Sequence, residues 1–195
     1  MPLSAHDRDL LLTLARESIR AHLQNRLPPD PPSIEVDEEY GGVFVTLYHA
    51  GRLRGCVGRL EMNGPLPVVV QNVAIAVLRD ARFSHVPITL ADLPRLTIEI
   101  SLLSRLQRAA DPLAFEPGVH GVYIRRDDCM GCFLPQVATK MGWDREEFLE
   151  RCCVDKAGLP PGAWKDRDTE IYFFTTTTLR EDPAGVGNPN PPGRS

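Results

Sequence analysis

A cysteine inside a short glycine-rich segment is the residue of this sequence best suited to chemistry. Residues 53–58 read Leu-Arg-Gly-Cys-Val-Gly, and in an extended strand Arg54, Cys56 and Gly58 point to one face. A guanidinium about 7 Å from the thiol, by strand geometry, favours the reactive thiolate. We predict a catalytic nucleophile at Cys56, with substrate-binding positions at Arg54, Gly55 and Gly58, because the glycines leave room for a substrate. The alternative is structural, since a reduced cysteine often packs as a small buried hydrophobe.

A second pair of cysteines, Cys129 and Cys132, has the spacing of half a zinc site or of a redox pair. A structural zinc ion needs two further ligands, and the other candidates, Cys152 and Cys153, are adjacent rather than spaced. A thioredoxin-like pair opens a helix after a strand, whereas this pair falls in a predicted hairpin. We therefore expect no metal site and no cofactor.

Periodicity and turn residues predict the elements that must position these cysteines. An apolar stripe predicts a helix over 7–26, and a second helix, over 65–79, is apolar nearly all round, as in a buried helix. Cys56 belongs to a β-hairpin with Ala50-Gly51 as its turn. The remaining ranges are hairpin strands at 42–49 and 52–60, a half-buried strand at 95–104, a hairpin at 119–126 and 130–134, helices at 135–142 and 145–158, and a last strand at 169–178.

The mixture of hairpins and helices, without regular βαβ alternation, predicts an α+β fold. We expect a mainly antiparallel sheet with flanking helices, in one domain over 5–180. The segment 181–195 has no large apolar residue beyond Val186, so a disordered C-terminal tail is expected there.

The composition excludes several classes of protein. Hydrophobic residues make up 43% and charged residues 25% of the 195, which excludes a wholly disordered chain. A net charge of −4 provides no field to hold nucleic acid or an anionic membrane non-specifically. No apolar run reaches the ~20 residues of a membrane span, and no secretory signal opens the sequence. The five cysteines lack disulfide spacing, so we expect reduced thiols and a cytoplasmic protein.

The segment 53–58 resembles the L-R-G-C-[IV]-G signature of the AMMECR family. Further family motifs follow in order at 82–83, 96–101, 120–122, 134–138, 142–143, 156–159 and 164. The sequence departs from the family pattern at Ala81 and His85, where proline is usual. The resemblance implies a large and a small subdomain with a cleft between them, and it adds Arg82 and Gln136 to the substrate-binding positions. In prokaryotes such proteins resemble the A component of the AmmeMemoRadiSam set, encoded beside a Memo-like and a radical SAM protein.

A catalytic thiol also needs a base, and His120 matches the family's His-Gly position. Glu99, a carboxylate on the polar face of an otherwise apolar strand, could orient the imidazole. We therefore predict a catalytic trio of Cys56, His120 and Glu99. Two ordinary roles compete with it: a histidine beside a glycine is often a turn residue, and a carboxylate on the wet face of a strand is common.

The leading hypothesis is a cytoplasmic AMMECR-like protein that acts on or carries a small molecule or anionic ligand at Cys56 in the cleft, together with Memo-like and radical SAM partners. The alternative is a non-catalytic adaptor that binds a protein or nucleic acid through the cleft. Nucleic acid is the less expected partner because of the negative net charge.

Overall fold

The computed structural model describes residues 3–34 and 40–181. The chain divides into two compact units. Unit 1 comprises Met1–Asp37, Val43–Ser101 and Thr178–Ser195, and unit 2 comprises Glu38–Gly42 and Leu102–Thr177. Each unit has a four-stranded sheet. The strand order in one is β2 (Arg52–Arg59), β1 (Tyr40–His49), β3 (Leu96–Ser104) and β8 (Thr176–Arg180), and in the other β4 (Gln107–Arg108), β7 (Glu170–Phe174), β5 (Gly121–Arg126) and β6 (Cys129–Phe133). Residues 182–195 of the expected tail lie outside the described residues.

The hairpin that carries Cys56 is confirmed. Strand β1 (Tyr40–His49) pairs antiparallel with β2 (Arg52–Arg59). The turn residues Ala50 and Gly51 have φ values of 49° and 76°, the left-handed conformation that a tight two-residue hairpin turn requires. Because Thr46 is directly opposite Cys56 in the register, the side chains of these two residues lie on the same face of the sheet.

A β-bulge interrupts this hairpin next to the cysteine. Leu47 pairs with Gly55, but the next residue, Tyr48, pairs with Leu53, which leaves Arg54 as the extra residue on β2. Strict alternation therefore fails at Arg54. The expected distance of about 7 Å between Arg54 and the thiol was calculated for a strand with strict alternation. The bulged strand does not have that geometry at Arg54, so the calculated distance does not apply.

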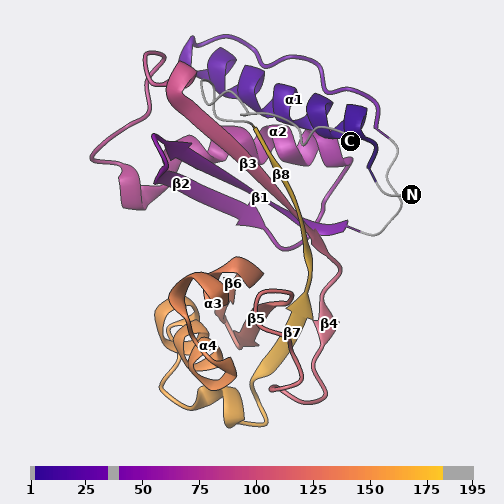
Figure 1. Ribbon diagram of the computed structural model, residues 1–195, viewed down its shortest axis with the longest axis vertical. Helices are drawn as coiled ribbons and strands as arrows, with labels where there is room; N and C mark the ends of the chain where they lie inside the picture. The colour runs from indigo at the N-terminus through magenta and orange to yellow at the C-terminus, as the bar shows by residue number, and fades with distance from the viewer. Residues whose placement is uncertain (1–2, 35–39, 182–195) are drawn as a thin grey trace, which may run out of the picture. The chain divides into compact units, whose positions relative to one another are not determined.

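Two helices cover one face of the unit 1 sheet (Figure 1). Helix α1 (Ala5–Leu23) begins with a capping box between Ser4 and Asp7. It packs against α2 (Leu66–Ala76), which continues as a 3-10 turn over Val77–Arg79. Most of α2 is buried, as its nearly uniform apolar sequence predicts. Short 3-10 turns at Ala81–Phe83 and Leu93–Arg95 follow before the next strand.

Strand β3 (Leu96–Ser104) corrects one expectation. The alternating pattern predicts a strand with one wet face, but Glu99 and Ser101 are buried as well as the apolar residues. Glu99 is only 6% exposed. Its neighbour is Arg180 on strand β8, whose guanidinium lies 3.3 Å from the carboxylate. A long side chain from the adjacent strand therefore helps to take this carboxylate out of water.

The last predicted strand is two strands in two different sheets. Strand β7 (Glu170–Phe174) belongs to the unit 2 sheet and β8 (Thr176–Arg180) to the unit 1 sheet. At the break, Thr175 donates its N–H to the Ser104 hydroxyl and accepts the Ser104 N–H. The single-strand prediction was wrong because the β-branched and aromatic run continues through the break without a turn residue.

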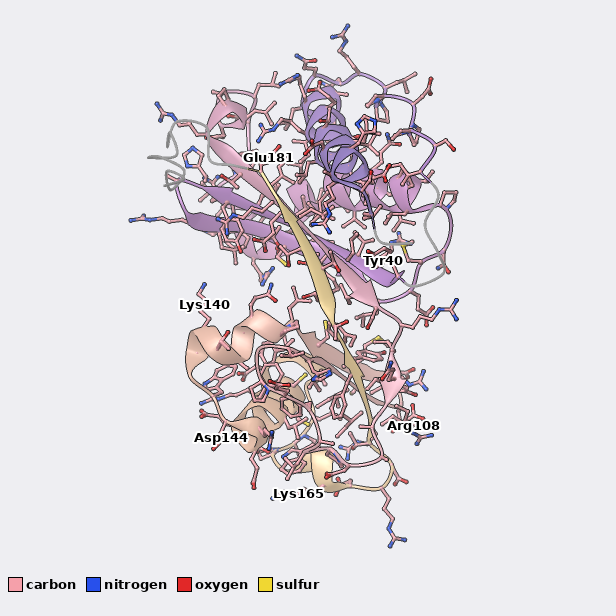
Figure 2. The ribbon with its side chains drawn as sticks, turned by 45° about the vertical axis from the view of Figure 1, so that its right-hand side comes forward. Tyr40, Arg108, Lys140, Asp144, Lys165 and Glu181 are labelled. Carbon is pink, nitrogen blue, oxygen red and sulfur yellow. The ribbon has the colours of Figure 1, made fainter. Side chains whose placement is uncertain are left out.

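Unit 2 is built on the second predicted hairpin, β5 (Gly121–Arg126) and β6 (Cys129–Phe133), which turns at Asp127 with φ 53°. Strand β7 pairs with β5 on one side and with the short β4 (Gln107–Arg108), which the sequence did not predict, on the other. The helices are α3 (Pro135–Met141), α4 (Arg145–Arg151), its π-helical continuation Cys152–Ala157, and a 3-10 turn at Ala163–Lys165. Figure 2 shows Asp144, the N-cap, at the start of α4.

The core of unit 2 is apolar and aromatic. The sheet and the helices share a buried cluster whose large members are Phe115, Val122, Ile124, Phe133, Phe148, Leu149 and Trp164. Cys152 and Cys153 are part of the same cluster. Gly142 and Gly158 end the helical segments in the left-handed conformation, as their positions predict.

Candidate functional site

The backbone of Cys56 is held by a pair of side chains from the turn after α2. Strand β2 is at the edge of its sheet, so the outward-facing backbone groups of Cys56 need partners from elsewhere. The Cys56 N–H donates to Asp80 Oδ2 at 2.9 Å, and Arg82 Nη2 donates to the Cys56 carbonyl at 3.0 Å. One acidic and one basic side chain thus hold both backbone polar groups of the cysteine.

These two side chains also fix each other. Arg82 donates from Nε to Asp80 Oδ1 at 3.0 Å and from Nη2 to Oδ2 at 2.6 Å. The Asp80 side chain is 7% exposed and that of Arg82 is 52% exposed. The hydrogen bonds from Arg82, together with those from the backbone of Cys56 and Arg82, lower the pKa of Asp80 to about 2. Asp80 is therefore ionised under ordinary conditions and accepts four hydrogen bonds.

The thiol itself is partly exposed and has a hydroxyl donor. Thr46 Oγ1 donates to Cys56 Sγ at 3.3 Å. Thr46 is 4% exposed, whereas Cys56 is in the intermediate class between buried and exposed. A donor aimed at sulfur stabilises the thiolate more than the thiol. Cys56 thus combines access for a reactant with a fixed hydroxyl donor to the sulfur.

The two glycines beside Cys56 make room for this chain's own side chains. A Cβ at Gly55 would lie 3.0 Å from the carbonyl oxygen and from Cγ2 of Val77. A Cβ at Gly58 would lie 2.2 Å from the Phe44 ring. The predicted substrate space above the glycines is thus occupied, in the structure, by Val77 and Phe44.

Three further polar side chains, Tyr48, Glu99 and Arg180, contact or influence one another across strands β1, β3 and β8, and Tyr48 is the one that the charge of Cys56 affects. Tyr48 lies on the same face of β1 as Thr46, and the Arg180 guanidinium lies 5.0 Å from the centre of the Tyr48 ring. Burial, then the charges of Glu99 and Cys56, raise the pKa of Tyr48, while Arg180 opposes the shift. Burial also raises the pKa of Glu99 against the attraction of Arg180. Both acids hold their protons more firmly than they would in water.

The predicted partner of the thiol, Arg54, makes its described hydrogen bond elsewhere. Arg54 Nη2 donates to the Val86 carbonyl at 2.8 Å, and its buried Nε has no partner among the described residues. The Cys56 carbonyl accepts from the guanidinium of Arg82, a residue that the family resemblance had added as a substrate-binding position. Attraction to Cys56 is the smallest of the causes that raise the pKa of Arg82; hydrogen bonding to Asp80 is the largest.

His120 and Gln136 belong to unit 2, whereas Cys56 and Glu99 belong to unit 1. The Glu116 N–H donates to His120 Nδ1 at 3.1 Å, so the neutral imidazole carries its proton on Nε2. Gln136 is exposed in the first turn of α3. The trio of Cys56, His120 and Glu99, and substrate binding by Gln136, remain predictions.

Comparison with known proteins agrees with the sequence motifs. The family model AMMECR1 matches residues 12–179. The chain belongs to the AMMECR1 family. A relative from Methanothermobacter thermautotrophicus is 39% identical over 192 residues, with 93% of this chain and 97% of the relative covered. A relative from Thermococcus gammatolerans is 37% identical over 187 residues, and the match covers 89% of this chain and 90% of the relative.

A solved structure of this family shares the fold. The crystal structure of an uncharacterised protein from Pyrococcus horikoshii matches this chain with a TM-score of 0.81 at 35% identity. The match covers 90% of this chain and 92% of the other. Both the predicted family resemblance and the α+β fold are thereby confirmed. Among the described residues of this AMMECR1-family chain, no helix has the length and apolar character needed to cross a bilayer.

The four other cysteines of this AMMECR1-family chain are thiols in very different places. Cys129 and Cys132 stand three residues apart on strand β6, so their side chains point to opposite faces about 10 Å apart along the strand. Burial is the main cause that raises the pKa of Cys152 well above its ordinary value and that of Cys153 to about 11. Within residues 3–34 and 40–181 no cluster of three or more metal-ligating side chains occurs.

Sequence reasoning missed three polar groups near Cys56 in this AMMECR1-family chain, Thr46, Tyr48 and Asp80, and it missed Arg180, which contacts Tyr48 from strand β8. Asp80 gives one local signal, because it follows an apolar helix and caps the next short turn at Arg82. The other three are spaced as outward-facing strand residues, and nothing in that spacing separates them from solvent-facing positions.

Proposed function

We propose that Cys56 is the reactive thiol of a small-molecule site on the polar face of the unit 1 sheet. Its thiol first loses its proton to solvent; the thiolate then adds to a carbonyl carbon, so that a carbon–sulfur bond forms while the C=O π bond breaks, and the carbonyl oxygen takes that electron pair and a proton. The observation that carries this proposal is the Thr46 hydroxyl donating to a partly exposed sulfur at 3.3 Å. The backbone clamp by Asp80 and Arg82 supports it, because a fixed thiol loses little freedom on reaction.

Tyr48 and Glu99 supply the polar surroundings of such a reaction. Tyr48 is a protonated hydrogen-bond donor at neutral pH, and the raised pKa of Glu99 increases the share of Glu99 that carries a proton. A donor on the sheet face of the thiol can stabilise the oxygen that gains charge when a thiolate adds to a carbonyl. Arg180, which contacts both acids, adds positive charge there. An electrophile with a carbonyl oxygen is therefore the substrate class that this face suits best.

Competitive alkylation tests the proposal. The folded chain is treated with limiting iodoacetamide at neutral pH, and modified cysteines are located by peptide mapping over time. We expect Cys56 to react several-fold faster than Cys129, because a hydroxyl donor and a nearby guanidinium favour its thiolate. Cys129 is the matched control, since it is the more exposed of the two thiols. If exposure alone set the rate, Cys129 would react first, and the proposal would fail.

Two arginine variants separate the candidate cationic partners. Arg82→Gln removes the guanidinium that contacts Cys56, and Arg54→Gln removes the one that donates to Val86. We expect Arg82→Gln to slow alkylation of Cys56 more than Arg54→Gln does. The opposite order would restore the role that the sequence predicted for Arg54.

We further propose that the protein is cytoplasmic and acts with Memo-like and radical SAM proteins, on the support of the family resemblance. The test is recovery of a tagged chain from its native cells, with Cys56→Ser beside the unaltered protein. We expect Cys56→Ser to recover the same partner proteins as the unaltered chain, but to fail to replace the unaltered chain in cells that lack it. An unchanged phenotype in Cys56→Ser, together with loss of a partner in a surface variant, would instead favour the adaptor.

A further inference from the structure

Unit 2 contains a cavity of its own, of about 460 Å³. Its lining includes Arg105 and Gln107 around β4, His120 in the loop before β5, and Phe173, Phe174 and Thr175 at the end of β7. The volume lies in the range of small-molecule sites in proteins. All lining residues belong to unit 2, so the cavity can be considered without reference to Cys56.

The imidazole of His120 is held in one orientation. Its Nδ1 accepts the Glu116 N–H at 3.1 Å, and its ring lies 6.3 Å from the ring of Phe173. The backbone N–H of His120 in turn donates to the Glu116 carbonyl, so residues 116 and 120 are joined by two hydrogen bonds. Because Nδ1 is an acceptor, Nε2 carries the proton and is a donor. Nε2 has no hydrogen-bond partner among the described residues, so the fixed ring keeps one donor for a ligand.

The polar lining suits an anion. Arg105 contributes a guanidinium, which stays positively charged. Gln107 contributes an amide, and Thr175 contributes a hydroxyl. None of the lining residues that the structure describes is acidic. Donors and positive charge without a lining carboxylate favour a carboxylate or phosphate group over a cation.

The remaining wall is aromatic. Phe174 is 1% exposed and Phe173 is partly exposed. The glycine next to His120 permits this wall, since a Cβ at Gly121 would lie 2.4 Å from the Phe174 ring. A flat apolar body packs well on such rings. The His-Gly motif therefore supplies both the donor and the space for the aromatic wall.

We propose that this cavity binds a small organic anion, a carboxylate or phosphate attached to a flat apolar body. The charged group accepts from His120 Nε2 and contacts Arg105, while the body packs on Phe173. The proposal assigns His120 to ligand binding in unit 2, and it stands whether or not Cys56 is reactive.

Titration of the isotope-labelled full chain by two-dimensional amide NMR tests the proposal. The probes are benzoate and phenyl phosphate, with benzamide as the neutral isostere and inorganic phosphate as the bare anion. We expect saturable shifts at Gln107, His120 and Thr175 with at least one organic anion, and which of the two binds identifies the charged group. Equal binding of benzamide, equal binding of bare phosphate, or no saturable shift in these residues would each overturn the proposal.

Matched variants give the second measurement. His120→Ala and Arg105→Gln should each weaken the preferred probe about tenfold, the usual effect of losing one charge-assisted hydrogen bond. His120→Gln, which keeps a donor near the place of Nε2, should retain most of the affinity. The controls are His85→Ala in unit 1 and Arg108→Gln, a neighbouring arginine outside the cavity lining (Figure 2). Unchanged affinity in both His120→Ala and Arg105→Gln would contradict the assignment even if the probe binds.

Discussion

Cys56, on strand β2, and Cys152, on the helical segment that packs against β6, are two thiols in opposite surroundings. Cys56 is partly exposed and lies among Thr46, Asp80 and Arg82. Cys152 is fully buried in the aromatic core of unit 2, and its sulfur approaches the Gly131 carbonyl at 3.6 Å. Burial raises the pKa of Cys152 well above its ordinary value, which suppresses the thiolate. The difference shows that the residue type alone does not decide whether a cysteine is accessible to a reactant or part of a core.

The two surroundings also depend on different forces. The Cys56 region depends on directional hydrogen bonds to one buried carboxylate, Asp80, so it should respond to charge and pH. The Cys152 region depends on filled volume, so it should respond to the size of its side chains and hardly to pH. Four variant sets test this contrast, from the largest expected effect to the smallest.

The first set places one methyl group in each region. A Cβ at Gly131 would lie 2.5 Å from the backbone nitrogen of Ala157, so strand and helix must move apart. A Cβ at Gly58 would lie 2.2 Å from the Phe44 ring, so a side chain rather than the backbone must move. We expect Gly131→Ala to lower the free energy of unfolding by about 3 kcal/mol, and Gly58→Ala by about 1 kcal/mol.

Urea unfolding measures both values. Both tryptophans, Trp143 and Trp164, belong to unit 2, so their fluorescence reports the Gly131→Ala effect, while circular dichroism follows the whole chain. A larger loss in Gly58→Ala than in Gly131→Ala would mean that the Cys56 face is as tightly packed as the unit 2 core.

The second set replaces each sulfur by oxygen. In Cys152→Ser the hydroxyl is buried, with its nearest described acceptor at the 3.6 Å of the sulfur contact, too far for a good O–H hydrogen bond. We expect it to lose about 1–2 kcal/mol of stability. Cys56→Ser keeps Thr46 as a partner and partial contact with water, so its change should stay within about 0.5 kcal/mol. Equal losses in the two variants, measured by urea unfolding, would remove the contrast.

The third variant, Asp80→Asn, removes the charge on which the Cys56 clamp depends. The pKa of Asp80 is about 2 in the folded chain and 3.8 without these contacts. A carboxyl pKa that is lower in the folded chain than in the unfolded chain stabilises the fold at pH values above the unfolded pKa. This stabilisation is lost as pH falls from about 4 through 2. We expect the variant to be about 1–2 kcal/mol less stable at pH 7, with roughly half of that difference gone at pH 3.

Its control is Asp128→Asn, an exposed carboxyl in the turn of the second hairpin. The urea midpoint of this control should follow that of the unaltered chain between pH 7 and pH 3. A difference for Asp80→Asn that stays constant across this range would show that the clamp acts through shape rather than charge.

Local patterns were enough to predict most elements. The turn at Ala50-Gly51, the caps at Asp144 and Gly158, and the apolar α2 sequence each correspond to a local backbone or packing requirement, and the structure confirms them. The break at Thr175 depends instead on hydrogen bonds to Ser104, 71 residues away in sequence. No periodicity within a strand contains that information, so the pattern there predicted one strand.

The candidate site divides in the same way. Cys56 could be chosen from its own segment, because residue types and glycine spacing are local. Its partners are not local: Asp80 is 24 residues and Arg82 is 26 residues from Cys56 in sequence. The bulge at Arg54 depends on the register with β1. The sequence was therefore enough to choose the candidate thiol, but the groups that hold its backbone could be named only from the folded chain.

The last variant, Glu99→Gln, asks whether the polar face of unit 1 contains a carboxylate that costs stability. Burial is the larger cause and raises the pKa of Glu99 above 4.5, and Arg180 offsets part of the shift. A raised carboxyl pKa has the opposite sign to that of Asp80: its stabilisation is complete below the unfolded pKa and is lost as pH rises through the folded value. The free energy of unfolding of Glu99→Gln at pH 7 should therefore equal that of the unaltered chain or exceed it by less than about 1 kcal/mol. This advantage should disappear as pH falls toward 4.

The control is Glu61→Gln, at an exposed position in the same unit, and its stability relative to the unaltered chain should show no such trend with pH. If Glu99→Gln is instead the less stable at pH 7 and the gap narrows in acid, the ion pair with Arg180 outweighs burial, and Glu99 stabilises the face as Asp80 does.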